Sequence, residues 1–128
     1  MGNTIWIDVQ DRPAAETHED LSVLHALTEQ CDALAKRLGI TPPSAFYDYS
    51  PLLPEEHASP SWFDANQGLE AMTALHGVLA EDFGRLRWTP DASQRHWPKS
   101  LLNELTFCDR ILVEAARDAR PFRLMIVG

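Results

Sequence analysis

Two short segments near the ends of the chain alternate in the way that β-strands do. Isoleucine or valine fills every second position of residues 4–10, with Trp6 and Asp8 on the other face, and this period of two predicts a strand. Residues 122–127 are apolar on both faces, as expected of a well-covered strand. Because a lone ribbon is marginal in water, we expect the two strands to pair and to lie against helices.

Between these strands, apolar side chains recur three times at helical spacing. Residues 19–38 predict a first helix with Gly39 as its stop. Residues 64–83 predict a second helix with Asp64 as its N-cap, and residues 97–120 predict a third with Pro98 in its first turn. Residues 40–63 hold five prolines and five aromatic residues, which predicts an unusually long loop.

The pattern therefore predicts a mainly helical α+β fold: a three-helix bundle with a small two-stranded sheet. If neighbouring elements run antiparallel, three helices return the last strand parallel to the first, and this is the orientation we expect. The long loop leaves the antiparallel alternative open. A chain of 128 residues, 45% of them hydrophobic, supports one core, so we expect residues 1–128 to form a single domain.

Charge and the two cysteines narrow the class of protein further. The formal charge is -8, which repels nucleic-acid phosphates, and residues 1–60 hold ten acidic and three basic side chains, a net -7. No run of apolar residues is long enough for a membrane span or a signal peptide. Cys31 and Cys108 have no neighbouring cysteine and fit small core residues of a reduced, cytoplasmic protein.

The histidines offer chemistry, each beside a simpler structural explanation. His18 and His25 share a polar helical stripe with Glu29 and Asp32, and such a set could bind a divalent metal. The stripe lies opposite the apolar seam, where a helix places its solvated face, so we expect neither metal nor cofactor. His76 falls within the apolar stripe of the second helix. It is either a hydrogen-bonded core histidine or an acid–base group at the floor of a pocket.

Aromatic residues and arginines are concentrated in two loops. The long loop could be a lid packed on the helices or a surface that grips a partner through rigid rings. The linker between the second and third helices joins arginine, histidine and tryptophan, a combination suited to stacking a ring or binding an anion; alternatively, its tryptophans close the end of the bundle. The candidate binding residues are Tyr47, Asp48, Tyr49, Trp62, His76, Arg87, Trp88, Arg95, His96 and Trp97.

Five short strings carry a resemblance over nearly the whole chain. Residues 5–9, 46–50, 62–64, 96–98 and 122–127 read IWIDV, FYDYS, WFD, HWP and FRLMIV. With these strings the chain resembles a family of small acidic bacterial conserved hypothetical proteins, which has no assigned activity. The resemblance implies a bacterial cytosolic setting and transfers no catalytic residue.

Three functions fit the sequence. No glycine-rich phosphate loop, serine-hydrolase elbow or paired-cysteine motif occurs, so the leading hypothesis is a non-enzymatic module that binds a protein partner, a basic one by charge. An immunity or antitoxin-like protein covering a basic toxin is one version. The alternative is a small enzyme or anion-binding protein with a pocket of histidine, tyrosine and arginine. The third is a homodimer that meets through a terminal strand or the long loop.

Overall fold

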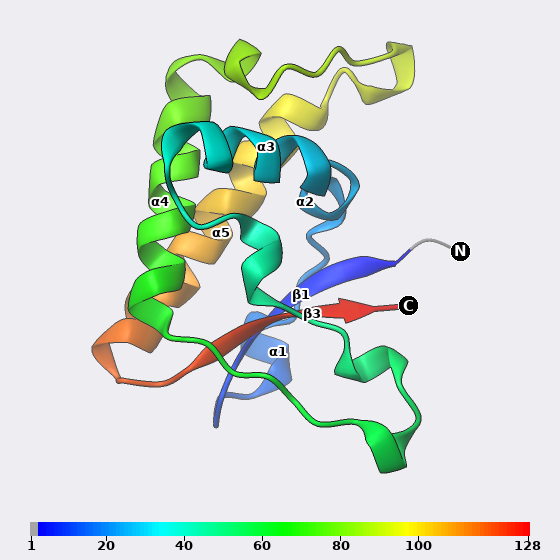
Figure 1. Ribbon diagram of the computed structural model, residues 1–128, viewed down its shortest axis with the longest axis vertical. Helices are drawn as coiled ribbons and strands as arrows, with labels where there is room; N and C mark the ends of the chain where they lie inside the picture. The colour runs from blue at the N-terminus through cyan, green and yellow to red at the C-terminus, as the bar shows by residue number, and fades with distance from the viewer. Residues whose placement is uncertain (1–2) are drawn as a thin grey trace.

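The structure, a computed structural model that describes residues 3–128, places a small sheet beneath a group of helices (Figure 1). This confirms the α+β class, but the helices number five in the described chain rather than three. The elements in chain order are β1 (Thr4–Val9), α1 (Ala14–Thr17), α2 (Ser22–Ala26), α3 (Thr28–Leu38), β2 (Tyr47–Asp48), α4 (Ala65–Glu81), α5 (Trp97–Arg117) and β3 (Phe122–Val127).

The terminal strands pair as expected, and the sheet gains a third strand from the long loop. The strand order is β1-β3-β2; β1 runs antiparallel to β3, with Thr4 opposite Val127, and β2 runs parallel to β3. The expected parallel pairing of the first and last strands is wrong. The chain between α3 and α4 returns to the sheet and forms β2 (Figure 1). Because of this additional crossing, β3 follows the α4–α5 hairpin in the direction opposite to β1.

The inner face of the sheet forms the base of the core. Alternate residues of β1 and β3, Ile5 and Phe122 among them, are at most 1% exposed. The Phe122 ring lies directly against Gly68 of α4, where the position of a Cβ atom would be 2.3 Å from Cζ. Only a glycine permits this approach of helix and strand.

The predicted first helix is divided into separate segments. α1 stands alone, and α2 and α3 are interrupted at Leu27. The Thr28 hydroxyl donates to the carbonyl oxygens of Leu24 and His25, at 3.1 and 2.9 Å. Side-chain hydrogen bonds of this kind compete with the backbone hydrogen bonds that would continue the helix. Gly39 ends α3 as predicted, with a left-handed φ of 71°.

The start of α2 is capped from a distant helix. The Glu104 carboxylate of α5 accepts hydrogen bonds from the backbone N–H groups of Val23 and Leu24, at 3.2 and 2.8 Å. These N–H groups have no partner within their own helix. Burial raises the pKa of Glu104, the two backbone hydrogen bonds lower it, and Glu19 adds a smaller upward effect; the net direction is upward.

The two long helices match the sequence closely. Asp64 caps α4 by accepting from the Asn66 N–H at 2.9 Å, and Pro98 lies in the first turn of α5. Within the described residues, no helix combines the length and apolar character needed to cross a bilayer.

Candidate functional site

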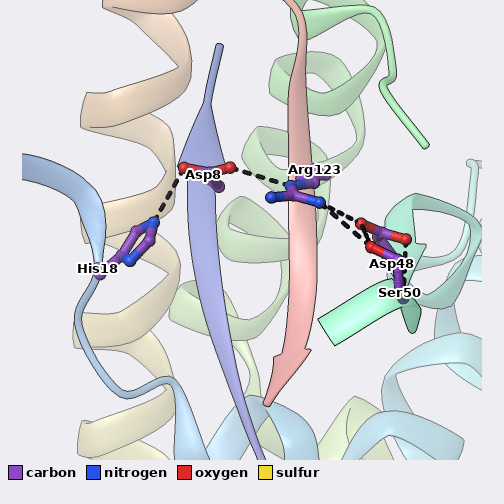
Figure 2. Close-up of polar contacts among 5 residues, drawn as sticks. All are labelled: Asp8, His18, Asp48, Ser50 and Arg123. Atoms are coloured by element: carbon purple, nitrogen blue, oxygen red, sulfur yellow. Dashed lines mark hydrogen bonds and ion pairs between the residues drawn. The ribbon is translucent and has the colours of Figure 1, made fainter. Parts of the chain in front are cut away.

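A row of polar side chains crosses the outer face of the sheet, away from the core. Because side chains alternate along a strand, Asp8 of β1, Arg123 of β3 and Asp48 of β2 project to this same face. Figure 2 shows them in line, with His18 at one end and Ser50 at the other. These five residues are called the outer-face row below.

Arg123 is the centre of the outer-face row. Its Nε donates to Asp8 Oδ2 at 2.9 Å and its Nη1 to Asp48 Oδ2 at 2.5 Å. Asp48 also accepts from the Ser50 N–H at 3.1 Å and from the Ser50 hydroxyl at 2.8 Å. One guanidinium therefore joins all three strands through two carboxylates.

The Asp48 carboxylate is ionised in this setting. Its residue is only 4% exposed, and burial by itself raises the pKa. The hydrogen bonds from Ser50 and the charge and hydrogen bond of Arg123 outweigh that effect, so the pKa of Asp48 lies below its ordinary value. The buried charge is thus stabilised by its partners.

His18 lies at the other end of the row and not on a helical stripe. Its Nε2 is 2.9 Å from Asp8 Oδ1, and its ring stacks on Trp6 with centroids 5.0 Å apart. The placement of His18 and His25 on one helix is therefore wrong, because α1 ends at Thr17. In residues 3–128 no group of three or more histidine, cysteine or acidic residues is arranged to bind a metal.

Two indoles flank the row. Trp62 lies under the Arg123 guanidinium, whose Cζ is 4.7 Å from the ring centroid, and Trp6 donates from Nε1 to Asp20 Oδ1 at 2.6 Å. Arg123 is thus already neutralised and stacked, and Ser50 donates to a carboxylate rather than to a histidine. The row has no nucleophile–base pair of the kind that covalent catalysis uses. Its hydrogen bonds and ion pairs hold the three strands of the sheet together.

The two tyrosines of the long loop have different roles. Tyr47 is buried, and its hydroxyl is 2.7 Å from the Thr28 hydroxyl; burial, the largest effect, raises its pKa despite the opposing hydrogen bond. Tyr49 is 56% exposed. Leu52 and Leu53, which follow it, are 44% and 50% exposed. We call Tyr49, Leu52 and Leu53 the 49–53 patch.

The candidates of the second linker lie at the other end of the molecule's long axis from the sheet (Figure 1). Trp88 and Trp97 stack on each other at 5.7 Å with an interplanar angle of 10°, and both pack against the core. Both are partly buried, in the position expected of tryptophans that close the end of the bundle. Arg87, Arg95 and His96 are exposed around them.

His76 is neither a fully buried core residue nor the floor of a pocket. Its side chain is 31% exposed, with Nε2 3.2 Å from the Thr106 hydroxyl and Nδ1 3.9 Å from Asp109 Oδ2. The expectation of a core histidine is wrong because His76 lies at the edge of the apolar face of α4. There it meets the polar side chains of Thr106 and Asp109 from α5. The pKa of Asp109 is raised by burial, although His76 and Thr73 oppose the shift.

The described cavities do not unite the candidates. One of about 260 Å³ lies between the start of α4 and the end of α5, and one of about 320 Å³ lies beside Gly39 and α4. Neither is lined by any of the ten candidate residues. Neither cavity therefore joins Tyr49 and His96.

A homodimer through the sheet edge meets obstacles within the described chain. β2 pairs with part of one edge of β3, and the Leu21 N–H donates to the Ile5 carbonyl at 2.9 Å on the free edge of β1. The edge that a second copy would join is thus partly occupied.

Of the outer-face row, only Asp48 is among the candidate binding residues predicted from the sequence, and His18 was expected in another place, on a helix. The available signal was an acidic residue at an outward position of one terminal strand and an arginine at an outward position of the other. Only the antiparallel register sets Asp8 opposite Arg123, so the wrong orientation concealed the pair. Comparisons of the chain with protein-family models, with curated proteins and with solved structures find no match.

Proposed function

We propose that the protein is a non-enzymatic interaction module that binds a protein partner through the 49–53 patch. The observation that carries this proposal is exposed apolar area. Tyr49, Leu52 and Leu53 are three of the four large hydrophobic residues that are exposed in the described chain, and they fall within five residues. Clustered exposed apolar side chains mark binding surfaces, whereas scattered ones do not.

The patch has a firm base, which lowers the entropic cost of binding. Ser50 lies in sequence between the residues of the patch but is only 6% exposed, and its hydroxyl donates to Asp48 of the outer-face row. The Tyr49 ring also meets the buried Tyr47 ring edge to face at 6.4 Å. A tyrosine held in this way suits an interface because a rigid ring loses little freedom on binding.

Charge selects the kind of partner. Glu55 and Glu56 are exposed directly after the patch, and ten of the chain's nineteen acidic residues lie in residues 1–60 with three basic ones. An apolar centre with an acidic rim fits a partner with an apolar patch and a basic rim. An immunity or antitoxin-like protein that covers a basic toxin is one form of this function.

The acidic first helix contributes less than its sequence implies. Glu29 is exposed on α3 and can attract a basic partner. Asp32 is occupied, because its Oδ1 accepts from the Ser44 N–H at 3.2 Å and holds the turn before β2. Steering is therefore assigned to Glu29, Glu55 and Glu56.

The test begins with capture of a partner from a lysate of the source organism at low and moderate salt, and continues with the purified pair. L52S/L53S should weaken binding by at least about tenfold, which is about 1.4 kcal/mol. V113S is the matched control, because Val113 is 48% exposed on α5. E55Q/E56Q should slow association and reduce its salt dependence.

Equal binding by L52S/L53S and the wild type would show that the patch is not the interface. A lysate that yields no partner, together with a monomeric mass at high concentration, would contradict the interaction function itself. If the wild type forms a dimer that L52S/L53S abolishes, the partner is a second copy of the chain.

A further inference from the structure

The end of the molecule opposite the sheet carries three arginines that converge from two elements. Arg37 lies in the last turn of α3. Arg85 and Arg87 lie in and just after the 3-10 helix η4 (Phe83–Leu86). Leu86 between them is 1% exposed, so this buried side chain anchors the turn and leaves both arginines at the surface. All three arginines are exposed.

One hydrogen bond joins the end of α3 to the turn that carries the other two arginines. Arg37 Nη2 donates to the carbonyl oxygen of Arg85 at 2.7 Å, which ties the end of α3 to η4. Partial desolvation and then the positive charges of Arg87 and Arg85 lower the pKa of Arg37. Arg37 therefore lies beside the turn that carries Arg85 and Arg87.

Within the described chain, no carboxylate forms an ion pair with this cluster. The ion pairs formed within residues 3–128 involve Arg12, Arg123 and two histidines, and none involves Arg37, Arg85 or Arg87. Arg87 also has a left-handed backbone, with φ 56° and ψ 51°, a conformation that a residue with a side chain rarely adopts. In a chain of charge -8, three neighbouring arginines without an ion-pair partner form a local positive surface that favours an anion.

We propose that Arg37, Arg85 and Arg87 form a binding site for the phosphate group of a small phosphorylated ligand. A phosphate dianion has more charge and more acceptor oxygens than one carboxylate, and it can receive paired N–H donors from several guanidinium groups at once. The negative charge of the rest of the chain disfavours a long polyanion, so the ligand is small. This site is separate from the 49–53 patch and does not depend on the proposed function.

The turn that carries the site is supported by aromatic packing. Trp88 follows Arg87 directly. Its ring lies against that of Phe83, with the ring centroids 6.5 Å apart, and stacks on that of Trp97. This packing, with the buried Leu86, fixes the backbone on either side of Arg87 before a ligand arrives. Arg95, a candidate from the sequence, forms no side-chain hydrogen bond with these arginines in the described chain and lies outside the proposed site.

Calorimetric titration with pyrophosphate at constant ionic strength tests the site, with acetate as the carboxylate probe. We expect saturable binding of pyrophosphate and none of acetate. R37Q and R87Q should each weaken it about tenfold, or about 1.4 kcal/mol. R117Q is the matched control, because Arg117 is an exposed arginine of α5 outside the cluster.

An NMR titration locates the binding in the same samples. Shifts of the backbone N–H signals of Arg85 and Arg87 would support the site, and thermal unfolding checks that each variant remains folded. The proposal is overturned if pyrophosphate does not saturate, if acetate binds equally well, or if R117Q loses as much affinity as R87Q.

Discussion

Two glycines of α4 provide a direct test of how the helix meets the sheet. A Cβ at Gly68 would be 2.3 Å from Phe122 Cζ and 2.4 Å from Cε1, whereas carbon atoms in contact are about 3.5–4.0 Å apart. Phe122 cannot move aside easily. It is fully buried, and its ring lies 5.3 Å from that of Phe46 and 6.5 Å from that of Phe63. At Gly77 the same Cβ would meet nothing within 4 Å.

Opposite effects on stability should follow. Alanine gains about 0.8–1.0 kcal/mol over glycine in a helix, and G77A should show this gain in the free energy of unfolding. At Gly68 that gain is set against overpacking, which costs about 1–3 kcal/mol. The distances above require the Phe122 ring or the helix to move by more than about 1 Å. We therefore expect an overpacking cost of about 3 kcal/mol, which leaves a net loss of about 2 kcal/mol in the free energy of unfolding of G68A.

Urea unfolding followed by circular dichroism measures both variants under the same conditions. The two should differ by about 3 kcal/mol, the sum of the expected gain and loss. The variants share one helix, so a change in helix propensity cannot explain the difference. If G68A is as stable as G77A, the close packing of Phe122 on α4 is wrong.

Three further predictions concern groups whose roles the structure defines. E104A should destabilise the fold by about 1–3 kcal/mol, because the N–H groups at the start of α2 lose their acceptor; an unchanged urea midpoint would contradict the cap. The lowered pKa of Asp48 means that its ionised form stabilises the fold above about pH 4 and that this contribution is lost as pH falls. The stability difference between wild type and D48N should therefore be larger at pH 7 than at pH 3, and a constant difference would refute the pairing with Arg123. Burial raises the pKa of Cys31 to about 12 and that of Cys108 further, so a thiol reagent should react with neither before unfolding.

The elements that the sequence predicted well are those fixed by local chemistry. The N-cap at Asp64, the stop at Gly39 and the proline at the start of α5 each act within one helical turn, so their signals lie in adjacent residues. The strands at residues 4–10 and 122–127 were clear for the same reason, since alternation needs only a few positions.

The parts that failed depend on partners far away in the chain. The cap on α2 involves Glu104, about eighty residues away from Leu24 in sequence, and no local pattern marks it as a cap. β2 has two residues and exists because β3 offers it an edge. The orientation of the strands depended on the path of residues 40–63, and the prolines there give no pattern from which the direction of the chain can be predicted. The wrong orientation of β3 then concealed the outer-face row, because the pairing of Asp8 with Arg123 requires the antiparallel register.

The outer-face row also shows why a cluster of chemically capable side chains need not be a reactive site. His18, Asp8, Arg123, Asp48 and Ser50 include the residue types of many active sites, yet each polar group faces another member of the row. A site that binds something else must leave groups without an internal partner. Two surfaces of the described chain gather such groups: the apolar side chains of the 49–53 patch, and the arginines beside η4 that form no ion pair. The row between β1 and β2 holds the first of these surfaces in position.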